Sequence, residues 1–499
     1  MCIKQLNKIT NSLLGEVLSL VAGMLLTLAF APFGQSWLAV LSPALLLLLW
    51  LNMSPRRAFF RGWLFGIGLF STGIYWVYIS IHTYGNASVS LASFITISFI
   101  AFLALFPAAN GYLLNRSFKE NNAAKILLAF PTIWVILEWF RSFLFSGFPW
   151  LFIGSSQINT PLKGYAPLFS VYGVSLAVVL SSAFLVHFCI KRTYSDLGKG
   201  LFIWIIGGAL TFITWTSPLR NPFPISLVQG NISQDVKWSV DQVQPTLDRY
   251  KALTEAHWQS KMIIWPEAAI PLTVQLADTF IDEMSRLAAE HHTTLITGVP
   301  MKVPDNEGYY NTIITLGQGR GIYLKRRLVP FGEYTPFPQV LEKILGKLDI
   351  PMSDFIPGKK MPEPLIAHGM KVSAFICYEI AFPEQVRNSD PDVGLILAVS
   401  NDAWFGHSVA QAQHLQIAQM RALEMGRPVL FVSNTGITAF IRSDGTVQSE
   451  APPFTTTVLT DTVQARQGKT PWQRWGLDPM MLTWIVMLVM AFLTRKRDI

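Results

Sequence analysis

The sequence has little charge for its length. Only 14% of its 499 residues are Asp, Glu, Lys or Arg, whereas ordinary soluble proteins carry about 25%. Aliphatic and aromatic residues make up 51% of the chain. This imbalance excludes a typical soluble composition and indicates a membrane protein. The length also exceeds that of one ordinary domain, so we expect at least two structural units.

Cysteine is scarce as well. The three cysteines are Cys2, Cys189 and Cys377, which provide no disulfide framework. His414 has no Cys or His cluster near it in the sequence. We therefore predict no metal site and no cofactor.

The net charge of +8 is a feature that nucleic-acid-binding proteins share. Here, however, most of the Lys and Arg residues lie in short loops between apolar stretches. That distribution is typical of membrane topology and not of a face that binds phosphates. We predict no nucleic-acid partner.

Long apolar stretches dominate the first 220 residues. A helix that crosses a bilayer needs roughly 20 mostly apolar residues. The sequence predicts seven such helices before residue 220 and an eighth near the C-terminal end. They lie near 13–32, 36–53, 58–80, 89–114, 124–144, 165–189, 200–217 and 478–494.

The loop charges predict the orientation of these spans. Basic residues occupy alternate loops, and loops 33–35 and 82–88 contain none; the basic positions are Lys4, Lys8, Arg56, Arg57, Arg116, Lys119, Lys125, Lys191, Arg192, Lys199, Arg495, Lys496 and Arg497. By the positive-inside rule, both termini are cytoplasmic. Seven spans then carry the following segment to the opposite side of the membrane. The expected domains are 1–220 with seven helices, 221–475 on the non-cytoplasmic side, and 476–499 with the eighth helix and a cytoplasmic tail.

The pattern changes in the stretch 221–475. Short β-rich runs alternate with amphipathic stretches, which predicts a layered α/β domain. The expected strands lie near 225–228, 262–265, 294–298, 311–316, 321–324, 371–376, 395–399 and 429–432, and the expected helices near 241–258, 276–291 and 410–426.

Three reactive side chains follow expected strands in this domain. Glu267 follows Ile-Ile-Trp-Pro, Lys325 follows Tyr-Leu, and Cys377 follows Phe-Ile. Taken singly, each side chain has an ordinary structural interpretation. Glu267 could be a surface glutamate in a turn, Lys325 part of a solvated basic patch, and Cys377 a buried structural cysteine. Taken together, they lie at strand ends of one α/β domain, which is where sites assemble.

The three groups also form a coherent chemical set. Thiolate is the reactive form of cysteine, and a carboxylate such as Glu267 can take the thiol proton during attack. An ammonium such as Lys325 can stabilise the oxyanion of a tetrahedral intermediate. The combination predicts acyl chemistry with Cys377 as nucleophile.

With its flanking residues, this Glu–Lys–Cys set resembles the nitrilase or carbon–nitrogen hydrolase superfamily, whose fold is an α-β-β-α sandwich. Joined to seven upstream spans and one downstream span, the whole chain resembles the apolipoprotein N-acyltransferases. The segments that carry this resemblance are 73–85, 134–157, 229–231, 265–271, 325–334, 377–379, 400–406 and 413–428.

The resemblance implies a two-step acyl transfer and its partners. A phospholipid, with phosphatidylethanolamine as the expected donor, gives its sn-1 acyl chain to Cys377 as a thioester. The amine of the diacylglyceryl-cysteine of an apolipoprotein then accepts the chain, which is the last step of lipoprotein maturation. We expect a monomer.

The resemblance also implies supporting residues. Glu333 is similar to a second glutamate that orients Lys325 or the incoming group. Tyr378 and Glu379 are similar to residues that support the site, and the backbone N–H of Tyr378 is a candidate oxyanion donor. Trp238 is similar to a tryptophan that contacts substrate. The chain departs from the family pattern at two positions. The family usually has His where this chain has Arg327, and it often has Tyr where this chain has Ser155.

Two further segments invite a membrane interpretation. The apolar stretch 331–357 is either an arm that dips toward acyl chains or a helix packed on the core. Glu138 and Arg141 lie one helical turn apart near the fifth span. Because intramembrane charges are costly, these two side chains either pair with each other or meet a phosphate head group.

Two other functions are compatible with parts of the sequence. A membrane-tethered amidase acting on a small carbon–nitrogen substrate could use the same three groups, although it would need only one anchor. A transporter with an accessory domain could have eight spans, but the spans contain few ionisable residues and no obvious paired broken helices.

Overall fold

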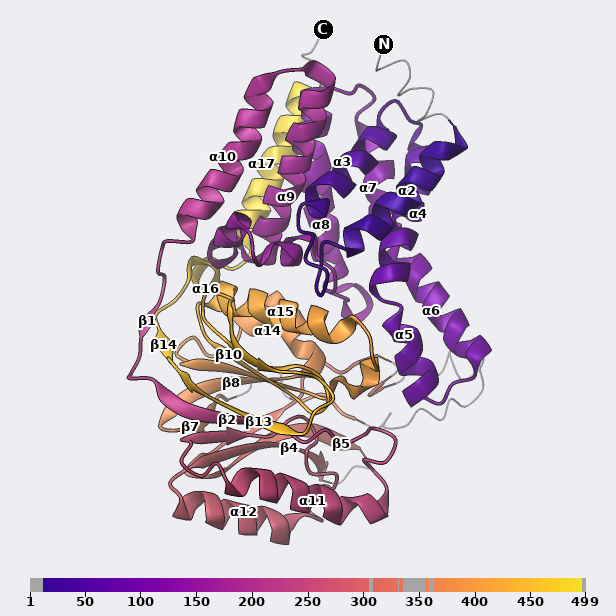
Figure 1. The fold of residues 1–499 in the computed structure, drawn as a ribbon. Coiled ribbons are helices and arrows are strands. Elements are labelled where there is room, and N and C mark those ends of the chain that lie inside the picture. The colour runs from indigo at the N-terminus through magenta and orange to yellow at the C-terminus, as the bar shows by residue number, and fades with distance from the viewer. Residues whose placement is uncertain (1–11, 305–307, 331, 335–354, 359–362, 496–499) are drawn as a thin grey trace. The chain divides into compact units, whose positions relative to one another are not determined.

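The computed structural model describes residues 12–304, 308–330, 332–334, 355–358 and 363–495. The chain divides into two compact units (Figure 1). The helical unit comprises Met1–Tyr78, Val89–Thr214 and Arg474–Ile499. The α/β unit comprises Ile79–Ser88 and Trp215–Gln473.

The helical unit consists of apolar helices joined by short loops. Its α-helices are α2 (Leu13–Thr27), α3 (Leu38–Trp50), α4 (Pro55–Gly73), α5 (Trp76–Ile79), α6 (Val89–Leu103), α7 (Leu105–Ser117), α8 (Phe130–Arg141), α9 (Ala166–Lys191), α10 (Tyr194–Leu210) and α17 (Asp478–Thr494). Small residues allow close packing between them. A Cβ atom on Gly23 of α2 would collide with the backbone carbonyl of Phe65 in α4.

Two helical stretches of the described chain are long and apolar enough to cross a membrane. They are Val89–Ser117, with 29 residues, and Pro161–Lys191, with 31. The pair Pro55–Gly73 and Trp76–Tyr84, bent by 54°, makes a third if it is one span. The apolar helices α2, α3 and α17 have 13 to 17 residues, so they are only about 20–26 Å long at 1.5 Å per residue. The eight-span count therefore stays a prediction.

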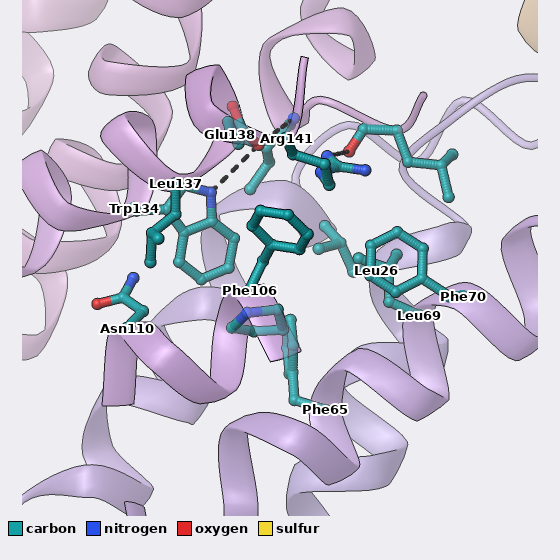
Figure 2. A pocket seen from close by; sticks show the side chains of 13 residues that line it. Leu26, Phe65, Leu69, Phe70, Phe106, Asn110, Trp134, Leu137, Glu138 and Arg141 are labelled. Carbon is teal, nitrogen blue, oxygen red and sulfur yellow. Dashed lines mark hydrogen bonds between the residues drawn. The ribbon is translucent and has the colours of Figure 1, made fainter. Parts of the chain in front are cut away.

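The two intramembrane charges have protein partners (Figure 2). Glu138 accepts hydrogen bonds from Trp134 Nε1 at 3.2 Å and from the backbone N–H of Ile153 at 2.9 Å. Arg141 donates to the Trp150 carbonyl at 2.7 Å and lies over the Phe152 ring. Both side chains thus tie the loop after α8 to that helix. Glu138 also interacts electrostatically with Arg141, in agreement with the alternative in which the two side chains pair.

The α/β unit contains two six-stranded sheets. The first has the order β13-β2-β3-β4-β5-β6 and the second β12-β11-β10-β9-β8-β7. Strands β2, β3 and β4 are parallel, as are β8, β9 and β10. The first sheet comprises β2 (Phe223–Gln229), β3 (Met262–Ile264), β4 (Thr294–Lys302), β5 (Tyr309–Gly317), β6 (Ile322–Leu324) and β13 (Thr457–Val463); the second comprises β7 (Leu365–Ala367), β8 (Met370–Ile376), β9 (Leu395–Ser400), β10 (Val429–Ser433), β11 (Thr438–Ile441) and β12 (Val447–Ala451).

The two sheets pack face to face around one apolar core. Leu227 of the first sheet and Val372 and Leu397 of the second belong to the same buried cluster. Fully burying such a side chain contributes about 1.5–3 kcal/mol. Because successive side chains of a strand point to opposite faces, Val228 turns away from this core and joins a second cluster with Tyr250 and other residues of the outer helices.

Helices cover both outer faces (Figure 1). Helices α11 (Val240–Glu255) and α12 (Asp278–Glu290) lie on the first sheet, whereas α14 (Pro383–Arg387) and α15 (Ala410–Met425) lie on the side of the second. The layers therefore run α-β-β-α, which confirms the sandwich predicted for this part of the chain.

All eight expected strands and all three expected helices of this domain are present. The sequence did not predict β7, β11, β12 and β13, nor the short pair β1 (Ser217–Pro218) and β14 (Arg466–Gln467). Strands β12 and β13 each have only one buried residue, so they lack the continuous apolar run of a buried strand.

Most of the apolar stretch 331–357, for which the sequence suggested either a membrane arm or a core helix, lies outside the described residues. These are residue 331 and residues 335–354. The segment Ile79–Ser88 belongs to the α/β unit, where Ser80 Oγ donates a 2.7 Å hydrogen bond to the Trp404 carbonyl.

Candidate active site

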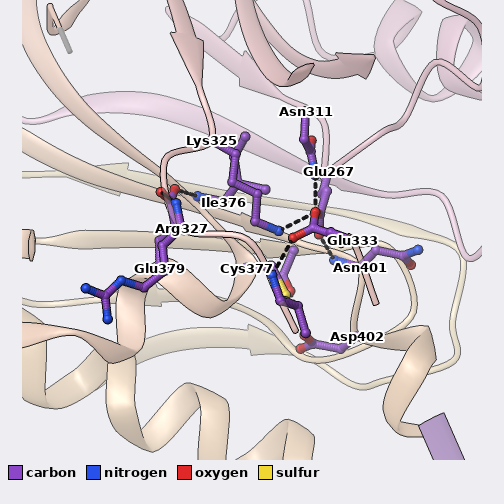
Figure 3. Close-up of polar contacts among 12 residues, drawn as sticks. Glu267, Asn311, Lys325, Arg327, Glu333, Ile376, Cys377, Glu379, Asn401 and Asp402 are labelled. Atoms are coloured by element: carbon purple, nitrogen blue, oxygen red, sulfur yellow. Dashed lines mark hydrogen bonds and ion pairs between the residues drawn. The ribbon is translucent and has the colours of Figure 1, made fainter. Parts of the chain in front are cut away.

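The three reactive side chains predicted from the sequence converge at one place in the sandwich (Figure 3). Glu267 follows β3, Lys325 follows β6, and Cys377 follows β8. Strands β3 and β8 belong to the parallel parts of the two sheets. The carboxyl ends of such strands are the usual location of binding sites in α/β folds.

Glu267 is positioned by a tight exit from β3. The backbone N–H of Gly298 donates to the Pro266 carbonyl at 3.2 Å, and a Cβ atom at Gly298 would clash with the Ala268 nitrogen. Only glycine permits this close approach. The buried Glu267 carboxylate then accepts from Asn311 Nδ2 at 2.7 Å through Oε1 and from the Asn401 backbone N–H at 2.9 Å through Oε2.

Lys325 lies between two carboxylates. Its Nζ atom is 2.8 Å from Glu333 Oε1 and 3.3 Å from Glu267 Oε1. Asn311 Nδ2 donates to both glutamates, at 2.7 Å to Glu267 and 3.0 Å to Glu333. Burial alone would lower the pKa of Lys325, but the two carboxylates raise its pKa overall. The side chain is therefore a fixed cation.

Glu333 is held from both ends. Its Oε2 atom accepts a 2.9 Å hydrogen bond from the Val329 backbone N–H, while Oε1 faces Lys325. The Glu333 backbone N–H also donates to the Val329 carbonyl at 2.9 Å. This local turn fixes the second carboxylate against the lysine.

Cys377 is half-buried and has a φ angle of 52°. Positive φ is uncommon for residues other than glycine and costs on the order of 1–3 kcal/mol when the surrounding structure imposes it. Here it turns the chain sharply from β8 into a short 3-10 helix, Cys377–Ala381. The turn presents the thiol beside the Lys325 and Glu267 side chains (Figure 3).

The pKa of the Cys377 thiol lies above its ordinary value. Burial raises this pKa, the Glu267 carboxylate raises it further, and the opposing effect of Lys325 is smaller. These surroundings favour the thiol over a preformed thiolate. Attack by sulfur then requires a base that takes the proton as the bond forms.

Glu379 connects the strand ends that carry Lys325 and Cys377. Its fully buried carboxylate accepts hydrogen bonds from five donors, which are the backbone N–H groups of Arg326, Arg327 and Ile376, Tyr323 Oη and Gln385 Nε2, at 2.7 to 3.1 Å. A carboxylate has about four lone-pair positions, so its hydrogen-bonding capacity is filled. Glu379 thus fixes the spacing between the two segments.

The remaining predicted residues lie around this centre. Tyr378 is half-buried, and its ring packs edge-on against Phe382 at 5.0 Å. Arg327, where the resembled family has His, lies over the same Phe382 ring at 3.7 Å. Trp238 is 38% exposed in the loop after β2, and its neighbour Lys237 donates to the Glu267 carbonyl at 3.3 Å.

Sequence reasoning missed several contributors. Asn311 donates hydrogen bonds to both Glu267 and Glu333, but in the sequence it is only one residue of a β-rich run. Asn401 binds Glu267 through its main chain, which leaves no side-chain signature. His414 and Asp402 lie beneath the nucleophile, with His414 Nε2 3.2 Å from the Cys377 carbonyl. Among the residues that the structure describes, no group of three His, Cys, Asp or Glu side chains could hold a metal ion.

The geometry supports covalent acyl chemistry. A thiol, a carboxylate that can take its proton and a fixed cation that can face an oxyanion are the components of nucleophilic catalysis on a carbonyl group. The helical unit, in turn, carries apolar helices of membrane-spanning length.

Comparison with known proteins agrees with both units. The family model described as the apolipoprotein N-acyltransferase N-terminal domain matches residues 22–184, and the carbon–nitrogen hydrolase model matches residues 225–471. Among solved structures, the chain is similar to the nitrilase-superfamily protein Nit3 of Saccharomyces cerevisiae, with a TM-score of 0.37 and 16% identity over 50% of this chain and 92% of that one. A Nesterenkonia amidase of the nitrilase superfamily matches with a TM-score of 0.39 and 17% identity over 54% and 99%.

Sequence relatives cover nearly the whole chain. The apolipoprotein N-acyltransferase of Coxiella burnetii is 44% identical over 96% of this chain and 100% of its own length. The enzyme of the same name from Azotobacter vinelandii is 40% identical over 97% and 96%. Identity at this level over both units shows that the chain belongs to the apolipoprotein N-acyltransferase family.

Proposed function

We propose that this enzyme N-acylates lipoproteins by carrying a fatty acyl chain on Cys377, with Glu267 as general base and Lys325 as oxyanion stabiliser. The convergence of these three side chains, in a chain related over its whole length to apolipoprotein N-acyltransferases, is the observation that supports this assignment. Glu333, Tyr378, Glu379 and Trp238 support the site or contact substrate.

The first step forms a thioester. Glu267 takes the thiol proton as Cys377 Sγ attacks the ester carbonyl of a phospholipid, and Lys325 faces the oxyanion. When the intermediate collapses, the carbon–oxygen bond to the glycerol breaks. The proton on Glu267 passes to the leaving oxygen, and a lysophospholipid departs. One oriented oxyanion donor is worth about 3–4 kcal/mol in such a site.

The second step forms an amide. The neutral α-amine of the diacylglyceryl-cysteine attacks the thioester carbonyl while Glu267 takes a proton from the nitrogen. The carbon–sulfur bond breaks, the Cys377 sulfur takes the proton back, and the triacylated lipoprotein leaves. Because one covalent intermediate links two substrates, the kinetics should be ping-pong.

The partners and the location complete the proposal. Phosphatidylethanolamine is the expected donor, a diacylated apolipoprotein the acceptor, and the enzyme acts as a monomer without a cofactor. Eight helices span the bacterial inner membrane. Both termini face the cytoplasm, and residues 221–475 form the periplasmic catalytic domain.

Mass spectrometry of the intact protein tests the proposal. The purified enzyme is incubated with phosphatidylethanolamine in the absence of acceptor, and its peptides are analysed. We expect a long-chain acyl mass on Cys377 and its loss when a diacylated lipopeptide is added. Cys377→Ala should carry no adduct, and Glu267→Gln and Lys325→Ala should form it far more slowly.

Two results would overturn the proposal. An acyl adduct on another residue would remove Cys377 from its role. No adduct, together with ammonia release from small amides, would indicate an amidase instead. Replacing the exposed Glu290 by Gln in the same domain provides a control, because Glu290 pairs only with Arg286 on the surface of α12 in the described structure.

A further inference from the structure

We propose that His414 is a positioning residue that is held as an imidazolium between Asp402 and the Cys377 carbonyl, where it fixes the peptide plane that follows the nucleophile. The inference rests on the proposed function of Cys377. It concerns a histidine that has no role in the proposed acyl transfer.

The geometry places His414 between two acceptors. Its Nδ1 atom lies 3.0 Å from Asp402 Oδ1, and its Nε2 atom lies 3.2 Å from the Cys377 carbonyl oxygen. Both His414 and Asp402 are fully buried. A backbone carbonyl can only accept a hydrogen bond, so Nε2 must carry a hydrogen.

The contact with Asp402 decides whether the other ring nitrogen of His414, Nδ1, also carries a hydrogen. Asp402 Oδ1 also accepts a 2.6 Å hydrogen bond from Ser400 Oγ, which makes it an acceptor for both neighbours. Asp402 Oδ2 has no hydrogen-bond partner within the described chain, so a proton there would be buried without an acceptor. The proton of this pair therefore lies between Asp402 Oδ1 and His414 Nδ1. Because imidazole is ordinarily a stronger base than a carboxylate, we assign this proton to the ring nitrogen.

Aromatic rings pack around the His414 side chain. The His414 ring packs edge-on against Phe431 at 5.0 Å and Phe405 at 6.2 Å. The other charged pair on α15, Arg421 and Glu424, is joined internally at 2.9 Å two turns further along the helix. On the opposite side, the Cys377 turn faces the cation and carboxylates of the catalytic centre. Removing one partner of a buried ion pair costs about 3–5 kcal/mol, because the other charge is left buried without compensation.

Peptide planarity explains why this contact matters for catalysis. In a trans peptide the carbonyl oxygen and the following N–H point in opposite directions. A hydrogen bond that fixes the Cys377 carbonyl therefore fixes the Tyr378 N–H, the candidate oxyanion donor, on the other side of the same plane.

The test combines one variant with two measurements on the full-length protein. For His414→Gln we expect the rate of Cys377 acylation by phosphatidylethanolamine to fall about 10- to 100-fold, as when an oxyanion donor is misaligned, while the phospholipid KM is unchanged. Asp402→Asn should cause a similar fall, and the double variant should lose no more than either single one. His407→Gln is the matched control, since His407 is exposed on the same segment and stacks on Phe454.

Spectroscopy separates this role from a structural one. With ¹⁵N-labelled histidine, the signals absent from His414→Gln identify His414, and both of its nitrogens should show the shift of protonated nitrogen. In Asp402→Asn one of them should become unprotonated. A neutral His414 in the parent protein, or an acylation rate in His414→Gln equal to that of the parent, would overturn the proposal. If the parent protein forms no acyl adduct, the proposed function fails, whereas the nitrogen shifts still decide the charge of His414.

Discussion

The ammonium of Lys325 lies 2.8 Å from the Glu333 carboxylate, closer than its 3.3 Å distance to Glu267. The closer contact of the lysine is therefore with Glu333, the glutamate that is not the base in the proposed mechanism. In that mechanism Glu267 keeps its contact with the cation and exchanges a proton with sulfur and nitrogen. The proposal thus gives the two glutamates separable roles, which mutagenesis can distinguish.

Replacing Glu333 by Gln should lower the acylation rate without abolishing it. The amide oxygen can still accept from Lys325 Nζ, but the charge that holds the lysine is lost. We expect a fall of about 10- to 100-fold, compared with the 10²- to 10⁴-fold that a missing general base typically costs in Glu267→Gln. Single-turnover formation of the acyl adduct measures both. Equal losses in the two variants would contradict the division of roles.

Replacing Glu267 by Gln should make Cys377 more reactive toward alkylation, although the same change slows acyl transfer. Burial and the Glu267 carboxylate raise the pKa of Cys377, so less thiolate is present at a given pH. Removing the negative charge lowers this pKa and increases the thiolate fraction. Alkylation of Cys377 by iodoacetamide at pH 8 should therefore become faster as acyl transfer collapses.

The pH profile of the same reaction provides a second check. In the parent protein, alkylation should still be rising well above about pH 8.5, where a free cysteine is half ionised. The profile of Glu267→Gln should shift to lower pH, and that of the surface variant Glu290→Gln should not move. Slower alkylation in Glu267→Gln would show that the carboxylate does not raise the thiol pKa.

Replacing Glu379 by Gln should damage both stability and activity. An amide has one acceptor atom where the carboxylate has two, so at least two of the five donors lose their partner. Each buried donor without a partner costs about 1–3 kcal/mol. We expect a lower Tm together with slower acylation, measured by thermal unfolding and by adduct formation. An unchanged Tm would mean that other groups hold the strand ends together.

Labelling of single cysteines tests the proposed topology. In a background without the three native cysteines, a membrane-impermeant maleimide added to intact spheroplasts should label Glu290→Cys in the α/β unit. It should leave Lys119→Cys in the loop after α7 unlabelled until the membrane is opened. Both positions are exposed in the structure, so protection reports the side of the membrane. The reverse pattern would place the catalytic domain in the cytoplasm.

How far the sequence predicted this structure depends on the kind of signal. The buried parallel strand β9 is an almost continuous apolar run, so its position followed directly. Strand β12 is half-polar and pairs antiparallel with β11, so it becomes a strand only through its partner. The predicted fifth span, 124–144, is a π-helix, Ala124–Ala129, followed by α8, a break that apolar composition does not reveal.

The candidate site shows the same limit. Glu267, Lys325 and Cys377 were identified because each ends an apolar strand and fits a known motif. Asn311 was not, because its contact with both glutamates depends on the register that pairs it with Pro300 across β4 and β5. The contact of His414 with Cys377 depends on the packing of α15, which no local pattern encodes.

The raised pKa of the Cys377 thiol has a consequence for the lifetime of the enzyme. Oxidants and disulfides react with thiolate and hardly at all with a neutral thiol. In the oxidising periplasm to which the proposed topology assigns this domain, a nucleophile with a raised pKa stays reduced between turnovers. The nearby carboxylate that delays ionisation thereby protects the only cysteine of the catalytic domain from sulfenic acid formation and from mixed disulfides with secreted proteins.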